Sequence, residues 1–321
     1  MATSGVYTFN VTRDDIIRDA MTNLGKLYES EVPTAQETTD CARKLNMMVK
    51  QWQGKSDFAP GLKVWTRERA FLFLQKNQYQ YTVSSTTTDN WAVGGTQQLS
   101  TSTKAAAATT VNVPSITGIS SGDYIGVELD AGSIQWTTVS GAPSGTTVTL
   151  AAGLSSQSSS GSAIYTYLTK GNRPILIETV VLRDENHNDT PIGLLDINQY
   201  MSLPSKQNTS MTGDPNYIFY EPMLGSGTIW IDVGSPGDMS KYLYVSYMHD
   251  VQDFTTTLDN PYYPPEWYRA LAWGLTKEVA PMFNVNFTSE MAENFREAMA
   301  MAKEAYSETS SMYFQPGNDR A

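Results

Sequence analysis

The chain has 321 residues, 40% hydrophobic and 17% charged, which is typical of a soluble protein that buries a core. The formal net charge of −11 argues against a surface that grips nucleic acid, and one cysteine with two histidines permits no internal disulfide and no ordinary zinc site. There is no run of 18 apolar residues and no basic, apolar leader. We therefore expect no membrane span, and a protein kept in the cytosol unless it leaves as part of a particle.

The first expected element is a helix over residues 13–24. Thr12 supplies an N-cap, and Asp14 and Asp15 place negative charge in the first turn, where the helix dipole favours it. Apolar residues then recur at three- and four-residue spacing as far as Gly25, which can end a helix in the left-handed conformation. These signals predict an amphipathic helix.

A second helix is expected over residues 34–54. Thr34 and Glu37 have the spacing of a capping box, in which each side chain bonds to the other residue's backbone N–H. The apolar stripe that follows includes Cys41 and ends at Gly54. We therefore interpret Cys41 as a buried, inert thiol.

Beyond residue 60 the hydrophobic pattern changes to the two-residue period of β-strands. A host sheet is expected from strands over 70–74, 79–83, 175–182, 217–220, 228–233 and 242–247. Residues 84–168 are nearly uncharged and rich in Ser, Thr, Gly and Ala, yet they contain short alternating runs separated by turn residues. We interpret this stretch as an inserted small β-barrel or sandwich, and we expect the flanking segments 79–83 and 164–168 to pair.

Two more helices are expected near the C-terminus, over residues 265–280 and 289–310. Pro265 and Glu266 suit a first helical turn, because proline needs no hydrogen-bond acceptor there and the acid favours the dipole. Pro281 follows the last residue of the first helix. Apolar stripes on both segments predict that they pack against other elements.

The C-terminal tail carries an apolar triplet, Met312, Tyr313 and Phe314, after a polar run and before Pro316. We predict that these three residues dock on a partner protein, because an extended segment with adjacent aromatics can fill a groove or extend a sheet edge. The alternative is that the rings fold back onto the preceding helix.

The expected fold class is α+β. The helix pairs at the two ends are each too small to bury a core alone, so we expect them to form one α-helical bundle. A β-sandwich-like middle region should complete the main body of the protein. We assign residues 1–83 and 169–321 to this main body and residues 84–168 to the inserted β-domain.

Three parts of the chain carry motifs of a known family. They are the helical segments 17–25 and 42–52, the segment 265–271 with the alanine-rich helix to 305, and the β-segment 213–217 with 227–229 and Pro236. These parts resemble the tail accessory factors of short-tailed phages, also called head-to-tail adaptors, packaged-DNA stabilisation or head-completion proteins. The inserted β-domain at 84–168 departs from the family pattern, so no role is carried over to it.

The resemblance implies a virion structural protein at the head–tail interface, assembled in the host cytoplasm. It implies a homo-oligomeric, twelve-fold ring that binds the portal protein and joins it to the tail nozzle or to tail fibre or spike proteins. Double-stranded DNA would be retained by the ring and then ejected through its channel without sequence-specific binding. Under this interpretation, the triplet 312–314 docks on the portal or a neighbouring partner.

Catalytic, cofactor and metal sites are not indicated by the sequence. His187 and His249 stand alone in polar surroundings, without a nucleophile and an orienting acid near them in sequence. The acidic segment with Asp184, Glu185 and Asp189 lacks the regular spacing of a calcium loop, so we interpret it as a solvated turn. We therefore expect no enzymatic activity.

Two other functions remain open. A carbohydrate-binding or adhesion module of a phage tail would use tryptophans of the inserted domain, Trp91 and Trp136, to stack sugars, although a core position suits Trp136 equally well. A muramidase acting during tail assembly is the third interpretation. Nothing in the sequence singles out two of its 33 acidic residues as a catalytic pair.

Overall fold

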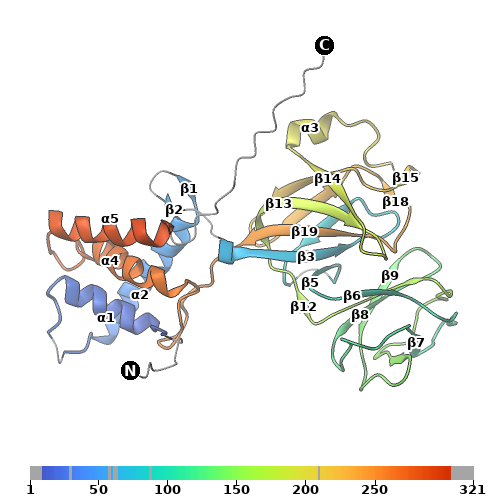
Figure 1. Cartoon of the computed structure of the whole chain (residues 1–321), viewed down its shortest axis with the longest axis horizontal. Helices are drawn as coiled ribbons and strands as arrows, with labels where there is room; N and C mark the ends of the chain where they lie inside the picture. Colours follow the sequence, from blue (N-terminus) through green and yellow to red (C-terminus); the bar gives the residue numbers. More distant parts are fainter. Residues whose placement is uncertain are drawn as a thin grey trace, which may run out of the picture. The chain divides into compact units, whose positions relative to one another are not determined.

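The chain divides into two compact units in the computed structural model, which describes residues 9–28, 31–56, 59–60, 64–86, 89–208 and 210–304. Residues 1–65 and 251–321 belong to one unit, and residues 66–250 belong to the other. We call them the helical unit and the β unit (Figure 1). The β unit is thus a continuous piece of chain between the two halves of the helical unit.

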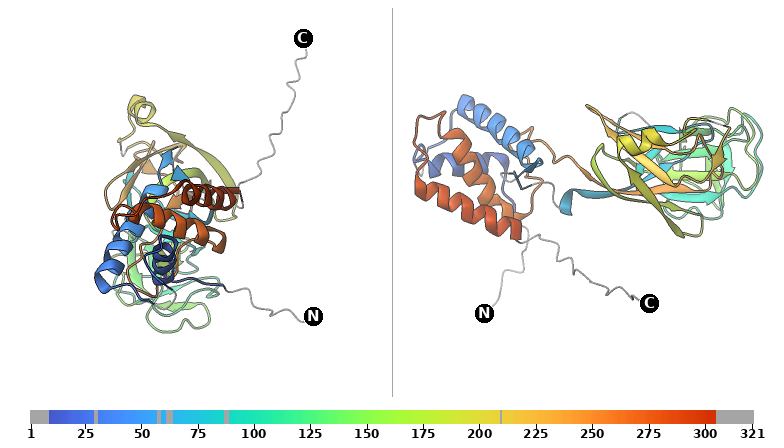
Figure 2. Two further views of the ribbon diagram at one scale, coloured as in Figure 1. Left: turned by 90° about the vertical axis from the view of Figure 1, so that its left-hand side faces the viewer. Right: turned by 90° about the horizontal axis from the view of Figure 1, so that it is seen from above.

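The helical unit is built from both ends of the chain. Its elements are α1 (Arg13–Asn23), α2 (Ala35–Trp52), β1 (Lys55–Ser56), β2 (Ala59–Pro60), the short 3-10 turn η2 (Pro265–Trp267), α4 (Tyr268–Val279) and α5 (Ser289–Glu304). Helix α4 contacts α1, α2 and α5, and Figure 2 shows these helices packed together. This arrangement confirms the predicted α+β class with the terminal helices in one bundle.

Local chemistry fixes where these helices begin. Thr12 and Thr34 are N-caps whose side chains accept the backbone N–H of Asp15 and Glu37, and both acids bond back to the cap residue. Behind the caps, the apolar stripes meet in one core that includes fully buried Leu45. Because α1 and α2 lie more than 200 residues before α4, this core joins the two ends of the chain.

The β unit contains most of the strands. They are β3 (Arg67–Phe73), β4 (Gln80–Val83), β5 (Trp91–Val93), β6 (Thr96–Leu99), β7 (Thr110–Asn112), β8 (Tyr124–Glu128), β9 (Ile134–Thr138), β10 (Thr147–Thr149), β11 (Ala163–Tyr167), β12 (Thr169–Lys170), β13 (Pro174–Arg183), β14 (Asp189–Leu195), β15 (Thr212–Gly213), β16 (Tyr217–Pro222), β17 (Gly227–Ile231), β18 (Ser235–Pro236) and β19 (Tyr242–His249). The turn η1 (Val64–Thr66) precedes β3, and the short helix α3 (Ile197–Ser202) follows β14.

A curled mixed sheet dominates this unit (Figure 1). Among the described residues its strand order is β12-β5-β3-β19-β13-β14-β16-β17-β4, and only β14 and β16 run parallel. The connection between those two strands carries α3. Smaller sheets follow the orders β6-β11-β8-β9, β10-β7 and β15-β18.

The curled sheet and the four-stranded sheet β6-β11-β8-β9 share an aromatic cluster. Alternate residues on one face of the curled sheet form its own core, including Leu72, Tyr81 and Trp91. On the other face, Phe73 of β3 stacks on Tyr165 of β11, with ring centroids 4.4 Å apart. The hydroxyl of Tyr165 also donates a hydrogen bond to the carbonyl of Met239. The four-stranded sheet is therefore tied to the curled sheet by packing as well as by the chain.

One predicted pairing is wrong. The segments 79–83 and 164–168 do not pair, because β4 bonds to β17 while β11 lies between β6 and β8. Trp91 belongs to β5, which pairs with β3 and with β12. The curled sheet thus includes β5, from the start of the 84–168 region, and β12, which directly follows that region.

Candidate interaction surfaces

The predicted docking triplet Met312, Tyr313 and Phe314 lies outside the described residues, so its role stays a prediction. The two tryptophans considered for sugar stacking are described. Trp91 is fully buried, and its indole N–H donates to the carbonyl of Asn172 at 2.9 Å. Trp136 is half-buried and packs on the ring of Phe73. Both therefore serve the interior of the β unit.

The histidines and acids singled out in the sequence lie in structural positions. His187 has a positive φ of 62° in the turn after β13, where the Asp184 carboxylate accepts backbone N–H bonds from Asn186 and Asn188. His249 ends β19, and its Nδ1 lies 2.8 Å from the carbonyl oxygen of Asp250. Among the residues that the structure describes, no group of three or more His, Cys, Asp or Glu side chains could hold a metal ion.

Cys41 is fully buried on α2. Its burial, reinforced by the negative charges of Glu37 and Asp40, raises the pKa of the thiol to about 11. The thiol therefore stays protonated at neutral pH, which makes it a poor nucleophile and metal ligand. In the described part of the chain, no helix has both the length and the apolar character that crossing a bilayer demands.

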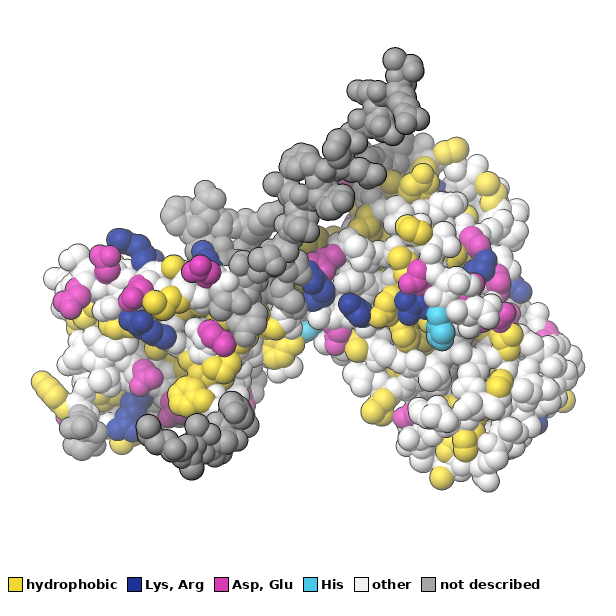
Figure 3. Space-filling model, viewed as in Figure 1, with side chains coloured by type: hydrophobic (Ala, Val, Ile, Leu, Met, Phe, Trp, Pro, Cys, Tyr) yellow, Lys and Arg dark blue, Asp and Glu magenta, His cyan; other side chains and the backbone are white. Residues whose placement is uncertain are grey.

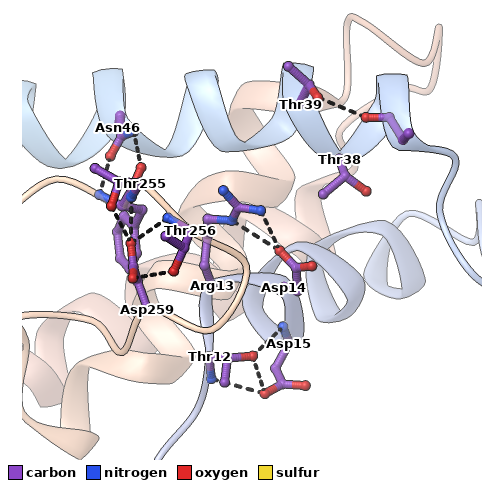
Figure 4. Close-up of polar contacts among 12 residues, drawn as sticks. Thr12, Arg13, Asp14, Asp15, Thr38, Thr39, Asn46, Thr255, Thr256 and Asp259 are labelled. Atoms are coloured by element: carbon purple, nitrogen blue, oxygen red, sulfur yellow. Dashed lines mark hydrogen bonds and ion pairs between the residues drawn. The ribbon is translucent and has the colours of Figure 1, made fainter.

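A polar loop holds the start of α1 in place (Figure 4). The carboxylate of Asp259 accepts hydrogen bonds from the hydroxyl of Thr256 and from the backbone N–H groups of Thr256 and Thr255, and these bonds hold the pKa of that carboxyl well below its usual range. The carbonyl of the same residue accepts the N–H of Arg13 at 2.8 Å. The loop therefore supplies an acceptor to a helix N-terminus whose first N–H groups have no partner within the helix.

The first candidate surface is a groove in the helical unit between α1 and α4, with a volume of about 340 Å³. It is lined by Phe9, Val11, Ile16, Asp19, Thr22, Asn23, Tyr268, Arg269, Ala272 and Trp273. Phe9 is 68% exposed, and its ring lies 6.1 Å from that of Tyr268. Covering an exposed aromatic surface of this kind with another protein is favourable, because it removes apolar area from water. We call this surface the helical groove.

The helical groove contains one ionisable acid with a perturbed pKa. Partial burial, together with the negative charge of Asp15 one turn earlier, raises the pKa of Asp19, while Arg18 acts in the opposite direction. Around it the groove offers rings and small side chains. Its chemistry thus suits an apolar side chain of another protein better than a charged small molecule.

The second candidate surface is a groove on one face of the curled sheet, with a volume of about 590 Å³. It is lined by Arg67, Arg69, Glu178, Thr179, Val181, Asp189, Tyr244 and Ser246, from β3, β13, β14 and β19. Figure 3 shows Lys and Arg side chains gathered over this part of the sheet, with acidic side chains beside them. We call this surface the sheet groove.

The connection between β14 and β16 exposes apolar side chains. Tyr200 anchors α3 by stacking on Phe219, with ring centroids 5.5 Å apart. Ile197 and Met201, one helical turn apart, remain 52% and 65% exposed. Helix α3 therefore adds a small apolar patch to the β unit.

Neither groove was identified from the sequence. The helical groove brings together side chains of α1 and α4, which lie some 250 residues apart and give no local signal. The sheet groove has one local signal, the alternation Arg67-Glu68-Arg69 within a strand, which places two guanidinium groups on one face. Glu178 meets Arg67 only through the pairing of strands far apart in the sequence, and Asp189 pairs with Arg183 across β13 and β14.

Comparison with known proteins gave limited similarity. No protein-family profile matches the chain, and no curated protein matches it. Among solved structures, the tailspike protein gp49 from Pseudomonas phage LKA1 is similar at 21% sequence identity and a TM-score of 0.20. The match covers 24% of this chain and 15% of that chain, so it is confined to a small part of a phage tail protein.

Proposed function

We propose that this chain is a virion structural protein without enzymatic activity, and that it forms the head-to-tail adaptor ring that joins a phage portal to the tail nozzle. One observation carries the proposal. The helices that bear the adaptor-like motifs come from opposite ends of the chain, and their motif residues, Ile17, Leu45, Trp52 and Leu271 among them, meet in one core. A chance likeness in separate segments would not require the segments to fold into one unit.

The helical groove provides a surface on which such a ring can close. In a ring, each copy contacts its neighbours through two different surfaces, one accepting and one inserted. The groove is concave and carries an exposed phenyl ring, so it is suited to be the accepting surface. The neighbouring copy of the chain is the occupant that we propose for it.

The charge of the β unit is consistent with a wall past which DNA moves. Residues 66–250 carry 15 Asp and Glu against nine Lys and Arg. Phosphate binding requires a surplus of clustered cations, so such a unit does not hold DNA by charge. In the proposed ring, DNA would be conducted through the channel without sequence-specific contacts.

The test is assembly of the purified full chain, alone and with a matching portal protein, followed by sedimentation velocity and negative-stain microscopy. We expect a monomer or a weak oligomer alone, and rings on the portal. Thr22→Arg places a long cation in the helical groove at an exposed position and should prevent ring formation. Thr39→Arg is the matched control, because this exposed residue of α2 lies outside the groove.

Four results would count against parts of the proposal. A chain that never associates with the portal is not an adaptor, and a stable ring formed without the portal contradicts the expected order of assembly. If Thr22→Arg and Thr39→Arg assemble equally well, the neighbour does not occupy the helical groove. Loss of turbidity when the chain is mixed with peptidoglycan would favour the muramidase interpretation instead.

A further inference from the structure

Arginine is concentrated in the sheet groove. The β unit has four arginines, and three of them, Arg67, Arg69 and Arg183, lie on β3 and β13. Arg67 and Arg69 share one face of β3, because side chains alternate along a strand. The β unit has 15 acidic and nine basic residues, so a face that carries three of its four arginines differs from the negative charge of the unit as a whole.

Two of these arginines are already paired. Arg67 bonds Glu178 through Nε and Nη2, at 2.6 and 3.1 Å, and Ser246 adds a hydroxyl bond to the same carboxylate at 3.3 Å. Arg183 bonds Asp189 through Nε and Nη2, at 2.7 and 2.8 Å. Both are fork-like pairs, which fix the orientation of the guanidinium and carboxylate planes.

Arg183 also lies over the ring of Tyr244, with its guanidinium carbon 4.1 Å from the ring centre. This cation–π contact covers one face of the tyrosine and adds rigidity to the pair with Asp189. The groove is therefore walled by two ordered ion pairs rather than by mobile single charges.

Arg69 is the exception. It is exposed and stands opposite Ser246 in the register of β3 and β19, and its side chain forms no ion pair or hydrogen bond with the described residues. Its guanidinium keeps five N–H donors in a rigid plane, a shape that matches a carboxylate. One unpaired cation thus faces a groove whose other charges are neutralised.

This donor and acceptor pattern discriminates between ligands. A dense polyanion such as nucleic acid requires a surplus of clustered cations, whereas beyond its two ion pairs the groove offers Arg69 alone among the described residues. An apolar ligand would strip water from two ion pairs without replacing their hydrogen bonds. A sugar hydroxyl both donates and accepts, so it can bond to carboxylate lone pairs and guanidinium N–H groups alike.

We propose that the sheet groove binds an acidic saccharide, with the sugar carboxylate on Arg69 and ring hydroxyls on Glu178, Asp189 and Thr179. The groove volume of about 590 Å³ lies within the range of small-ligand sites, roughly 300 to 1,000 Å³. Ligands with one carboxylate on a hydroxyl-rich ring, such as uronic and sialic acid units, match this pattern. The site lies within the β unit, so it does not depend on ring formation.

The test is isothermal titration calorimetry of the full chain with oligogalacturonate, a hyaluronan oligomer and a sialylated oligosaccharide. At least one should bind, and the methyl ester of the same oligomer, which has the hydroxyls but not the charge, should bind about tenfold more weakly or worse. Arg69→Gln should reduce the affinity for the acid by a similar factor and leave that for the ester unchanged. Arg69→Lys should fall between the two, because lysine keeps the charge but not the fork.

Matched controls complete the design. Arg296→Gln, an exposed arginine of α5 outside the groove, should leave binding unchanged. The proposal is overturned if none of the three acids binds, if acid and ester bind equally, or if Arg69→Gln has no effect. It is also overturned if a glutamate peptide or polyphosphate of equal charge binds as tightly as the best saccharide. Portal assembly of Arg69→Gln should be normal, so failure here leaves the adaptor proposal standing.

Discussion

The helical unit and the β unit use their buried aromatic residues differently. In the helical unit, Trp267 is fully buried among Trp52 and Tyr263, and its indole N–H has no hydrogen-bond acceptor among the described residues. In the β unit, the hydroxyl of Tyr81 bonds the turn before its own strand, and the N–H of Trp91 bonds a loop carbonyl. The buried ring of Trp267 only fills space, whereas the Tyr81 hydroxyl and the Trp91 N–H also form hydrogen bonds with backbone groups of loops.

The two grooves repeat this difference at the surface. The helical groove is lined by rings and alkyl groups, and the sheet groove by ordered ion pairs. Apolar surface favours burial by a protein neighbour, whereas directed polar groups favour a hydroxyl-rich ligand. The four predictions that follow test whether this contrast holds, in order of expected effect.

The largest effect is expected from truncating the central rings. Trp267→Ala and Trp91→Ala each leave a large cavity and should cost about 3–5 kcal/mol of unfolding free energy. Hydrogen exchange should show faster opening in the helical unit for the first variant and in the β unit for the second. Leu224→Ala, at a fully exposed turn, is the control and should cost nothing measurable. Equal loss of protection in both units would mean that they unfold as one.

A smaller effect separates the two kinds of tyrosine. The Tyr81 hydroxyl accepts the N–H of Gln75 at 2.8 Å and lies 3.1 Å from the carbonyl of Gln78, so Tyr81→Phe should cost about 1–3 kcal/mol by leaving these groups unpaired. Tyr263 forms no hydrogen bond with the described residues through its hydroxyl, so Tyr263→Phe should change stability by less than about 0.5 kcal/mol. Urea unfolding of both variants gives the comparison, and similar losses would contradict it.

Helix caps provide the third comparison. Thr34 caps the 18-residue helix α2, and Asp196 caps the six-residue helix α3 with the same capping-box geometry. Thr34→Ala should cost about 1 kcal/mol, because fraying of α2 would weaken the packing of a helix that contributes to the core. Asp196→Ala should cost less, since α3 buries little beyond Tyr200. A larger loss for Asp196→Ala would show that the crossover between β14 and β16 depends on α3.

Much of this fold could be predicted from local signals, and the exceptions have physical causes. The capping residues predicted α1 and α2 closely, and Pro265, the predicted start of the third helix, begins the 3-10 turn η2 that leads into α4. Strand β14 was not predicted, because Asp189–Leu195 contains Pro191 and shows no clean alternation of buried and exposed residues. Helix α3 was missed because six residues are too few to display a helical period.

The partners of strands and grooves were harder to predict than the elements. Segments 79–83 and 164–168 look alike in composition, but pairing depends on which faces must be buried, and β4 pairs with β17 while β11 lies between β6 and β8. The alternation of arginines in β3 is visible in the sequence, but the pairing of Arg67 with Glu178 is not. Long-range packing, rather than propensity, decides these features.

The smallest effect tests the carboxylates of the two grooves, and its sign should differ between them. Partial burial and the charge of Asp15 raise the pKa of Asp19 in the helical groove, whereas bonding to Arg183 lowers the pKa of Asp189 in the sheet groove. A raised pKa means that the folded state holds the proton more tightly than the unfolded state does. Charged Asp19 therefore weakens the fold at neutral pH, and Asp19→Asn should stabilise it by up to about 0.5 kcal/mol.

The pH dependence distinguishes this explanation from a simple packing change. The gain of Asp19→Asn should be present at pH 7 and vanish below about pH 3.9, the unfolded pKa of aspartate, where the wild-type carboxyl is protonated in both states. Asp189→Asn should do the opposite, losing stability at pH 7 and converging with the wild type as pH falls through the lowered pKa of the folded state. Urea unfolding of the full chain between pH 3 and 7 measures both curves. A gain for Asp19→Asn that persists at pH 3 would show that the groove tolerates the charge and that the amide stabilises it by other contacts.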